Sequence, residues 1–222
     1  MSRTRITLVL AVLAASLVAA QPASAHHGCS KHAKGGKVTH KTKEAHVFEK
    51  NNRWWGCAAR VKRPYVLPGL DTLDARRFED GTVPNHIKLA GVFVAYERYT
   101  LYPAGGAGDT QTDLYVVDLR NGKVVVDEEA RPPTGQMEDR SVTDLVLKRN
   151  GSVAWISDHW TYDTNPAVVN YEVHRFSRDP ANPGRALLDS GGDIERDSLA
   201  LAADRKTIVW TKGGQQKSGQ LP

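Results

Sequence analysis

The sequence predicts an all-β protein built from antiparallel β-propeller-like repeats, about four hairpin or blade units that form an incomplete or open propeller. Three observations support this fold class. The composition is turn-rich, with 19 glycines and 11 prolines among 222 residues against two methionines and four phenylalanines. Strand-like hairpins recur along the chain. After the N-terminal segment, no stretch shows the 3.6-residue period of an amphipathic helix.

Residues 1–25 have the pattern of a secretory signal peptide. Arg3 and Arg5 precede a largely apolar run from Ile6 to Ala20, and small residues follow it. An apolar run of about 15 residues is shorter than the roughly 20 that cross a bilayer as a helix. We therefore expect a cleaved signal, a secreted or extracellular protein and no membrane span.

Residues 26–45 are predicted to be a disordered basic arm rich in histidine and lysine, and residues 46–222 to be the β-propeller-like domain. Residues 26–63 carry ten Lys and Arg against the two acids Glu44 and Glu49. The scattered lysines form no periodic face, which is typical of a solvated lead segment. The same charge can also attract an anionic cell-envelope polymer, and both interpretations stay open.

Cys29 and Cys57 are the only cysteines and allow a single pairing. An exported protein meets an oxidising environment, so we expect one disulfide between them. In the chain-entropy model a loop of about 29 residues stabilises the fold by at most roughly 3.5 kcal/mol. The bond would tie the start of the exported chain to the first strand of the repeats.

Four copies of a strand–turn–strand unit align on the aromatic residues Trp55, Tyr96, Trp155 and Trp210. These aromatics lie 41, 59 and 55 residues apart, within or slightly beyond the length of a propeller blade. Side chains at equivalent positions of the repeated strands are predicted to be buried: Val92, Val94, Tyr96, Val153, Trp155, Ile208 and Trp210.

A second hairpin lies between these units and is clearest at residues 113–126. Asn121-Gly122 at its tip predicts a type I′ turn, because this dipeptide tolerates positive φ angles. Weaker copies occur at residues 58–67 and 171–188. Each unit can therefore supply up to four short antiparallel strands, which is the content of one blade.

These motifs carry a resemblance to known proteins. The pattern apolar-x-apolar-x-x-Gly-x-apolar-Ala-aromatic, followed by Leu-Tyr-Val-Val-Asp-Leu-Arg-Asn-Gly-Lys at 114–123, resembles the blades of TolB-type and WD-repeat-like β-propellers. The chain is also similar to small secreted actinobacterial proteins of uncharacterised function that carry such half-propellers. The resemblance covers residues 45–222 and implies a fold, and it transfers no functional residue.

The densest polar and aromatic cluster follows the Trp155 strand. Asp158, His159, Trp160, Tyr162 and Asp163 are the candidate ligand-binding residues, placed in a loop on a rigid scaffold. The aromatics can stack on a sugar or peptide, and the carboxylates with the histidine can act as acid and base. The alternative is an ordinary solvated hairpin loop, since adjacent residues of a strand point to opposite faces.

The function predicted from these features is a secreted, non-enzymatic binding or interaction module. The alternatives are an extracellular carbohydrate-active hydrolase with paired acids, or a structural component of the cell envelope. No motif predicts a cofactor or a resident metal, although five of the eight histidines lie between residues 26 and 46 and leave adventitious metal capture open. The expected partner is an anionic envelope polymer or another secreted protein. We expect no nucleic acid and a monomeric chain.

Overall fold

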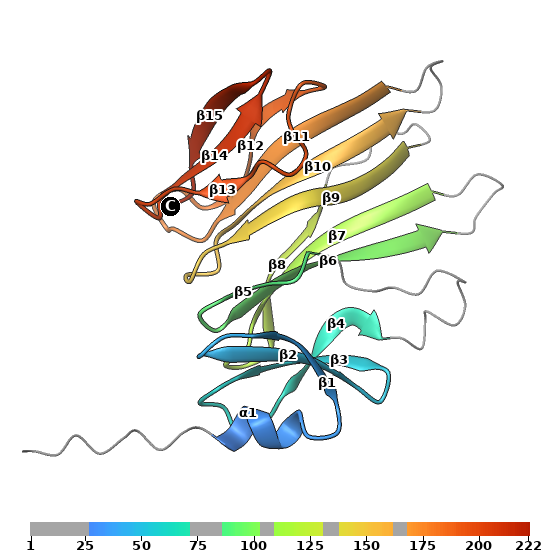
Figure 1. The fold of residues 1–222 in the computed structure, drawn as a ribbon, viewed down its shortest axis with the longest axis vertical. Coiled ribbons are helices and arrows are strands. Elements are labelled where there is room, and N and C mark those ends of the chain that lie inside the picture. Colours follow the sequence, from blue (N-terminus) through green and yellow to red (C-terminus); the bar gives the residue numbers. More distant parts are fainter. Residues whose placement is uncertain (1–26, 72–85, 103–108, 131–137, 162–167) are drawn as a thin grey trace, which may run out of the picture.

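Short runs with apolar residues at every second position form strands along most of the chain. The structure is a computed structural model that describes residues 27–71, 86–102, 109–130, 138–161 and 168–222. These residues form fifteen strands in four antiparallel sheets and one short helix (Figure 1). The prediction of an all-β, antiparallel protein is confirmed.

Sheets 1 and 2 have four strands each, and each is ordered as the strands occur in the chain. Sheet 1 contains β1 (Lys37–Lys41), β2 (Ala45–Lys50), β3 (Arg53–Ala58) and β4 (Tyr65–Asp71). Sheet 2 contains β5 (Lys88–Ala90), β6 (Phe93–Tyr102), β7 (Asp109–Asp118) and β8 (Lys123–Glu129).

Sheets 3 and 4 follow the same sequential order, with four and three strands. Sheet 3 contains β9 (Glu138–Leu147), β10 (Val153–Thr161), β11 (Val168–Ser177) and β12 (Gly184–Gly191). Sheet 4 contains β13 (Ala200–Leu201), β14 (Thr207–Lys212) and β15 (Gln215–Gln220).

Three apolar layers hold the four sheets in a stack, one between each pair of consecutive sheets (Figure 1). The alternation along β6 shows how one strand serves two layers. Val94 and Tyr96 face sheet 1, whereas Phe93 and Ala95 face sheet 3. Sheets 2 and 3 are therefore buried on both faces, which explains their near-continuous apolar strands.

The aligned aromatics Tyr96, Trp155 and Trp210 connect each sheet to the one before it. The Tyr96 hydroxyl donates to the carbonyl of Pro68 on β4 at 2.9 Å, and Trp155 Nε1 donates to the carbonyl of Ala130, just after β8, at 2.8 Å. Trp210 Nε1 donates to the Asp189 carboxylate on β12 at 2.9 Å. In each case a buried ring fills the layer and its polar atom bonds the last strand of the preceding sheet.

Six of the seven side chains predicted to be buried are buried, and Val92 is half-buried. The alignment of the first copy, however, is wrong. Trp55 stands on the third strand of sheet 1, whereas the other aligned aromatics stand on second strands. Its neighbour Trp54, 7% exposed, joins the apolar layer instead. The reason is that β1 adds a strand at the start of sheet 1 and shifts the count by one.

The turn prediction at Asn121-Gly122 is also wrong in detail. Gly122 alone has a positive φ, 74°, within a four-residue connection between β7 and β8. A two-residue turn with positive φ at both positions occurs instead at Asn51 and Asn52, with φ of 53° and 57°. This is the φ pattern of a type I′ turn, and asparagine tolerates it better than most residues.

The predicted disorder of residues 26–45 is wrong for the part that the structure describes. Helix α1 (His27–His32) and β1 lie there, and β1 pairs with β2 across the predicted domain boundary. The Cys29–Cys57 disulfide, with a Cα–Cα distance of 5.7 Å, confirms the predicted pairing. Lys50 Nζ donates to the carbonyls of His32 and Lys34 at the end of the helix.

Helix α1 covers the outer face of sheet 1. Cys29 and Ala33 pack with Phe48, Cys57 and Trp55, which point away from sheet 2. A lead segment without a periodic pattern is thus ordered by a covalent bond and by a small apolar cluster. Among the residues that the structure describes, no helix has the length and apolarity needed to cross a membrane.

Candidate functional site

One set of turns, with members from all four sheets, lies along one edge of the stack, which we call the turn edge. It comprises residues 42–44, 59–64, 91–92, 119–122, 148–152, 178–183 and 202–206. The turns that join β5 to β6 and β9 to β10 mark this edge on the left of Figure 1. Antiparallel hairpins of similar register bring these turns together, although they are far apart in sequence.

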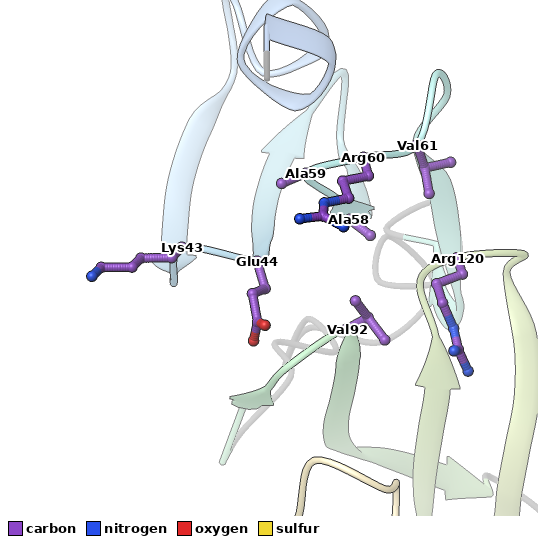
Figure 2. A pocket seen from close by; sticks show the side chains of 8 residues that line it. All are labelled: Lys43, Glu44, Ala58, Ala59, Arg60, Val61, Val92 and Arg120. Carbon is purple, nitrogen blue, oxygen red and sulfur yellow. The ribbon is translucent and has the colours of Figure 1, made fainter. Parts of the chain in front are cut away.

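A hollow of about 490 Å³ opens on the turn edge where sheets 1 and 2 meet. Figure 2 shows Arg60 and the Glu44 carboxylate on its sheet 1 side and Val92 facing them from sheet 2, while Lys43 extends outward from the rim. The lining residues are Lys43, Glu44, Ala58, Ala59, Arg60, Val61, Val92 and Arg120. The hollow therefore has an apolar wall and a predominantly basic rim.

A second hollow of about 460 Å³ lies on the same edge, between sheets 3 and 4. Its lining residues are Leu147, Lys148, Arg149, Asn150, Leu201 and Arg205. Like the first hollow, this one is lined by both apolar and basic side chains. Glu44 is the single carboxylate among the residues that line the two hollows.

Two acids in or beside the turn edge, Asp118 and Asp204, form hydrogen bonds within their own turns. Burial alone would raise the pKa of Asp118, but hydrogen bonds from the Arg120 side chain and backbone outweigh it and hold this pKa below its ordinary value. Hydrogen bonds from the Thr207 hydroxyl and from two backbone N–H groups lower the pKa of Asp204 to about 2. Both carboxylates remain ionised and hold turns together.

Several cations of the edge, by contrast, have no protein partner among the described residues. Lys43, Arg60 and Arg205 make no side-chain hydrogen bond or ion pair within that part of the chain. Lys148 differs, because its Nζ donates to the carbonyl of Leu221 at 2.5 Å. Burial lowers the pKa of Lys148. The free cations are the groups best placed to bind an anionic ligand.

The predicted loop site has a different setting from the one expected. Asp158, His159 and Trp160 belong to β10, which continues to Thr161, so their placement in a loop is wrong. Asp158 Oδ1 accepts hydrogen bonds from the Ser141 backbone at 2.9 Å and from its hydroxyl at 2.6 Å. This cross-strand pairing continues the strand into the polar cluster, and Asp158 is buried, with 7% of its surface exposed.

The ligand-binding role of the five predicted residues stays a prediction. Tyr162 and Asp163 lie outside the described residues. His159 is buried on the face opposite Asp158 and Trp160, whereas the Trp160 side chain is 40% exposed. Because β10 runs away from the turn at 148–152, Trp160 lies about 23 Å from that end of the strand at 3.3 Å per residue. Trp160 and the turn edge are therefore at opposite ends of sheet 3.

Two histidines outside these sites, the buried His174 and the half-buried His86, make contacts that support the stack. His174 stacks on Trp155 with ring centroids 5.2 Å apart, and its Nε2 lies 2.8 Å from Glu172. His86 Nδ1 lies 3.2 Å from Glu97, whose other oxygen accepts the Val142 backbone N–H of sheet 3. Within the described ranges, no three His, Cys, Asp or Glu side chains come together as a metal site.

Sequence reasoning missed the turn edge, although a signal for it was present. Aligning the repeats places basic residues in the first hairpin turn of three copies: Lys43, Arg149 and Arg205. In the remaining copy the turn carries Gly91, with a φ of 62°. If the hairpins stack in register, these basic residues come together along one edge of the stack.

No protein-family model and no curated protein matches the chain. Among solved structures it is similar to the extracellular domain of a proposed one-component system from Bacteroides thetaiotaomicron, with 12% identity and a TM-score of 0.34, over 81% of this chain and 21% of that one. It is also similar to an endo-arabinase from the same species, with 14% identity and a TM-score of 0.33, over 83% and 73% of the two chains. This chain spans about a fifth of the first structure's length, and at these TM-scores neither likeness carries an argument about function.

The His86–Glu97 pair makes a prediction about pH. The hydrogen bond to Glu97 raises the pKa of His86 above its ordinary value of 6.5, against the smaller opposing effect of burial. A raised folded-state pKa contributes stability that is fully present below the unfolded pKa and is lost as the pH rises through the folded pKa. The free energy of unfolding of wild type relative to His86→Asn should therefore fall as the pH rises from below 6.5 through the raised pKa of folded His86.

Urea titrations at several pH values measure this difference. His46→Asn is the control of opposite sign, because burial and then Lys41 lower the pKa of His46. Removing His46 should eliminate a loss of stability that develops as the pH falls below about 6.5. A difference between wild type and His86→Asn that stays constant across this range would contradict the assignment.

Proposed function

We propose that this protein is a secreted, non-enzymatic binding module that recognises an anionic polymer of the cell envelope through its turn edge. The observation that carries the proposal is the pair of hollows with apolar walls and basic rims. Arg60 belongs to one hollow and Arg205 to the other, and both are free to accept a ligand's acidic groups. Arginine matches the geometry of phosphate and carboxylate oxygens and stays charged at any physiological pH.

Export is supported by the signal-like pattern of residues 1–25 and by the disulfide that pins α1 to sheet 1. A disulfide in a small domain is typical of oxidising compartments. The wall and membrane surface that such a protein meets are rich in acidic polymers. Long-range attraction to such polymers is governed by the charge on the protein surface.

We infer further that the four sheets form an open, propeller-like stack rather than a ring. Each sheet packs on its neighbours in sequence order, as blades do. The two outermost faces of the stack differ in how they meet solvent. Helix α1 covers sheet 1, while the outer face of sheet 4 is mostly polar, with Thr207, Thr211 and the exposed Gln216, Ser218 and Gln220 around the half-buried Val209. Polar or covered terminal faces are what stacked repeats need for solubility.

The hydrolase alternative needs two carboxylates that face one pocket about 5 to 9.5 Å apart. The two hollows have only Glu44 between them, which pairs with Arg149. We therefore favour binding without turnover at the turn edge. A structural envelope component would differ by staying with the envelope at high salt.

The double variant Arg60→Gln/Arg205→Gln, which removes two positive charges, tests the turn edge. Two lost charge contacts should weaken binding to isolated envelopes by about tenfold at low ionic strength. The difference should shrink as salt is added, because salt screens exposed charges. Co-sedimentation of the purified secreted protein with envelopes, across a salt series, gives the measurement.

Lys37→Gln/Lys217→Gln is the matched control, since it removes the same charge from exposed positions on β1 and β15 away from the hollows. This control should bind nearly as wild type does. Equal losses in both double variants would mean that net charge alone drives binding. No loss in either would refute the turn edge as the site.

Trp160 provides a separate prediction in the same assay. If the exposed indole at the far end of β10 anchors a partner, Trp160→Ala should weaken envelope binding to a similar degree at all salt concentrations. Its 40% exposure makes large effects on folding unexpected, and the unfolding midpoint checks this point. Unchanged recovery would remove the predicted Trp160 contact and leave the turn edge as the single site under test.

A further inference from the structure

An ion pair stands between the two hollows of the turn edge. Arg149, which lines the second hollow, contacts the carboxylate of Glu44, which lines the first. The two residues come from sheets 3 and 1 and are 105 positions apart in the chain. The intervening turn of sheet 2 lies against both residues, since a Cβ at Gly91 would be in ordinary contact with Glu44 at 3.6 Å and with Arg149 at 3.7 Å.

This pair is exposed and therefore readily exchanged. The side chains of Arg149 and Glu44 are 66% and 39% accessible. Pairs of this kind contribute little to stability, because water solvates both partners well. An acidic group from a ligand can take the place of Glu44 on the Arg149 guanidinium with little loss to the fold.

The spacing of the hollows sets a lower limit on the ligand's length. Neighbouring packed sheets are about 10 Å apart, so a ligand that touches both hollows spans turns from sheet 1 to sheets 3 and 4. A single acidic unit is too short for this. The apolar walls, with Val61 and Val92 in one hollow and Leu147 and Leu201 in the other, favour carbon-containing units between the acidic groups.

We propose that the two hollows are successive subsites of one track for a linear polymer of phosphate groups joined by short polyol units, and that Glu44 is a built-in competitor for the phosphate that binds Arg149. The proposal rests on the proposed function and names its ligand class. In the free protein the Glu44 carboxylate occupies Arg149. In the complex a phosphate of the polymer pairs with Arg149, while Arg60 and Arg205 bind phosphates on either side.

Calorimetric titration of the secreted protein with poly(glycerol phosphate) of about 20 units, with glycerol 3-phosphate and with poly-L-glutamate tests this assignment. The polymer should bind at least tenfold more tightly per phosphate than the monomer, since contacts within one chain act at high effective concentration. Glu44→Gln should strengthen polymer binding about two- to fivefold, the affinity equivalent of an exposed ion pair. Arg149→Gln should weaken it.

The control Asp197→Asn also removes one negative charge, from an exposed side chain outside both hollows. Equal gains from Glu44→Gln and Asp197→Asn would overturn the competitor role. Equal affinity per acidic group for monomer and polymer would overturn the continuous track, and equal binding of poly-L-glutamate would overturn the phosphate assignment. Any of these results would leave the proposed function standing if envelope binding still depends on Arg60 and Arg205. If the wild-type protein does not bind to envelopes, the proposed function is refuted.

Discussion

The stack depends on one repeated interaction: a buried aromatic ring whose polar atom bonds the last strand of the preceding sheet. Tyr96, Trp155 and Trp210 each fill an apolar layer, and each donates one hydrogen bond across it. The ring contributes the burial, and the hydrogen bond contributes about 1 kcal/mol together with a fixed register between sheets. Leaving the donor unsatisfied in a buried layer would be costly, so sliding of one sheet over the next is penalised.

The fixed register has a functional consequence, because it aligns hairpin turns that are distant in sequence. Glu44 and Arg149 meet only because sheets 1, 2 and 3 are stacked with their turns level. The turns use their own acids for local hydrogen bonds, as Asp118 and Asp204 show, so the remaining basic side chains determine the charge of the edge. The same stacking places Trp160 at the opposite end of sheet 3.

Much of this fold could be predicted from periodic patterns and from an even cysteine count, whereas the turn edge can be recognised only once the stacking of the sheets is known. The hairpins around Tyr96, Trp155 and Trp210 and the Cys29–Cys57 bond follow from local sequence and chemistry. Helix α1 and β1 could not be predicted in this way. Their segment has no periodic pattern of apolar residues, and it is ordered by a disulfide and by strand pairing. The sequence alignment selects Trp55 where Trp54 faces sheet 2. Adjacent residues of a strand point to opposite faces, so the number of strands in the sheet decides which of the two joins the apolar layer. Asp158 was placed in a loop because its partner Ser141 comes from another strand.

Hydrogen exchange of Tyr96→Phe tests most directly whether the aromatic donors hold the sheets in register. This change removes one hydroxyl, keeps the ring against Tyr115, and leaves the Pro68 carbonyl without its donor. The account predicts a loss of about 1 to 3 kcal/mol in the free energy of unfolding. It also predicts faster amide exchange in β4 and the facing part of sheet 2, with β14 protected as in wild type. Unchanged stability together with unchanged exchange in β4 would contradict it.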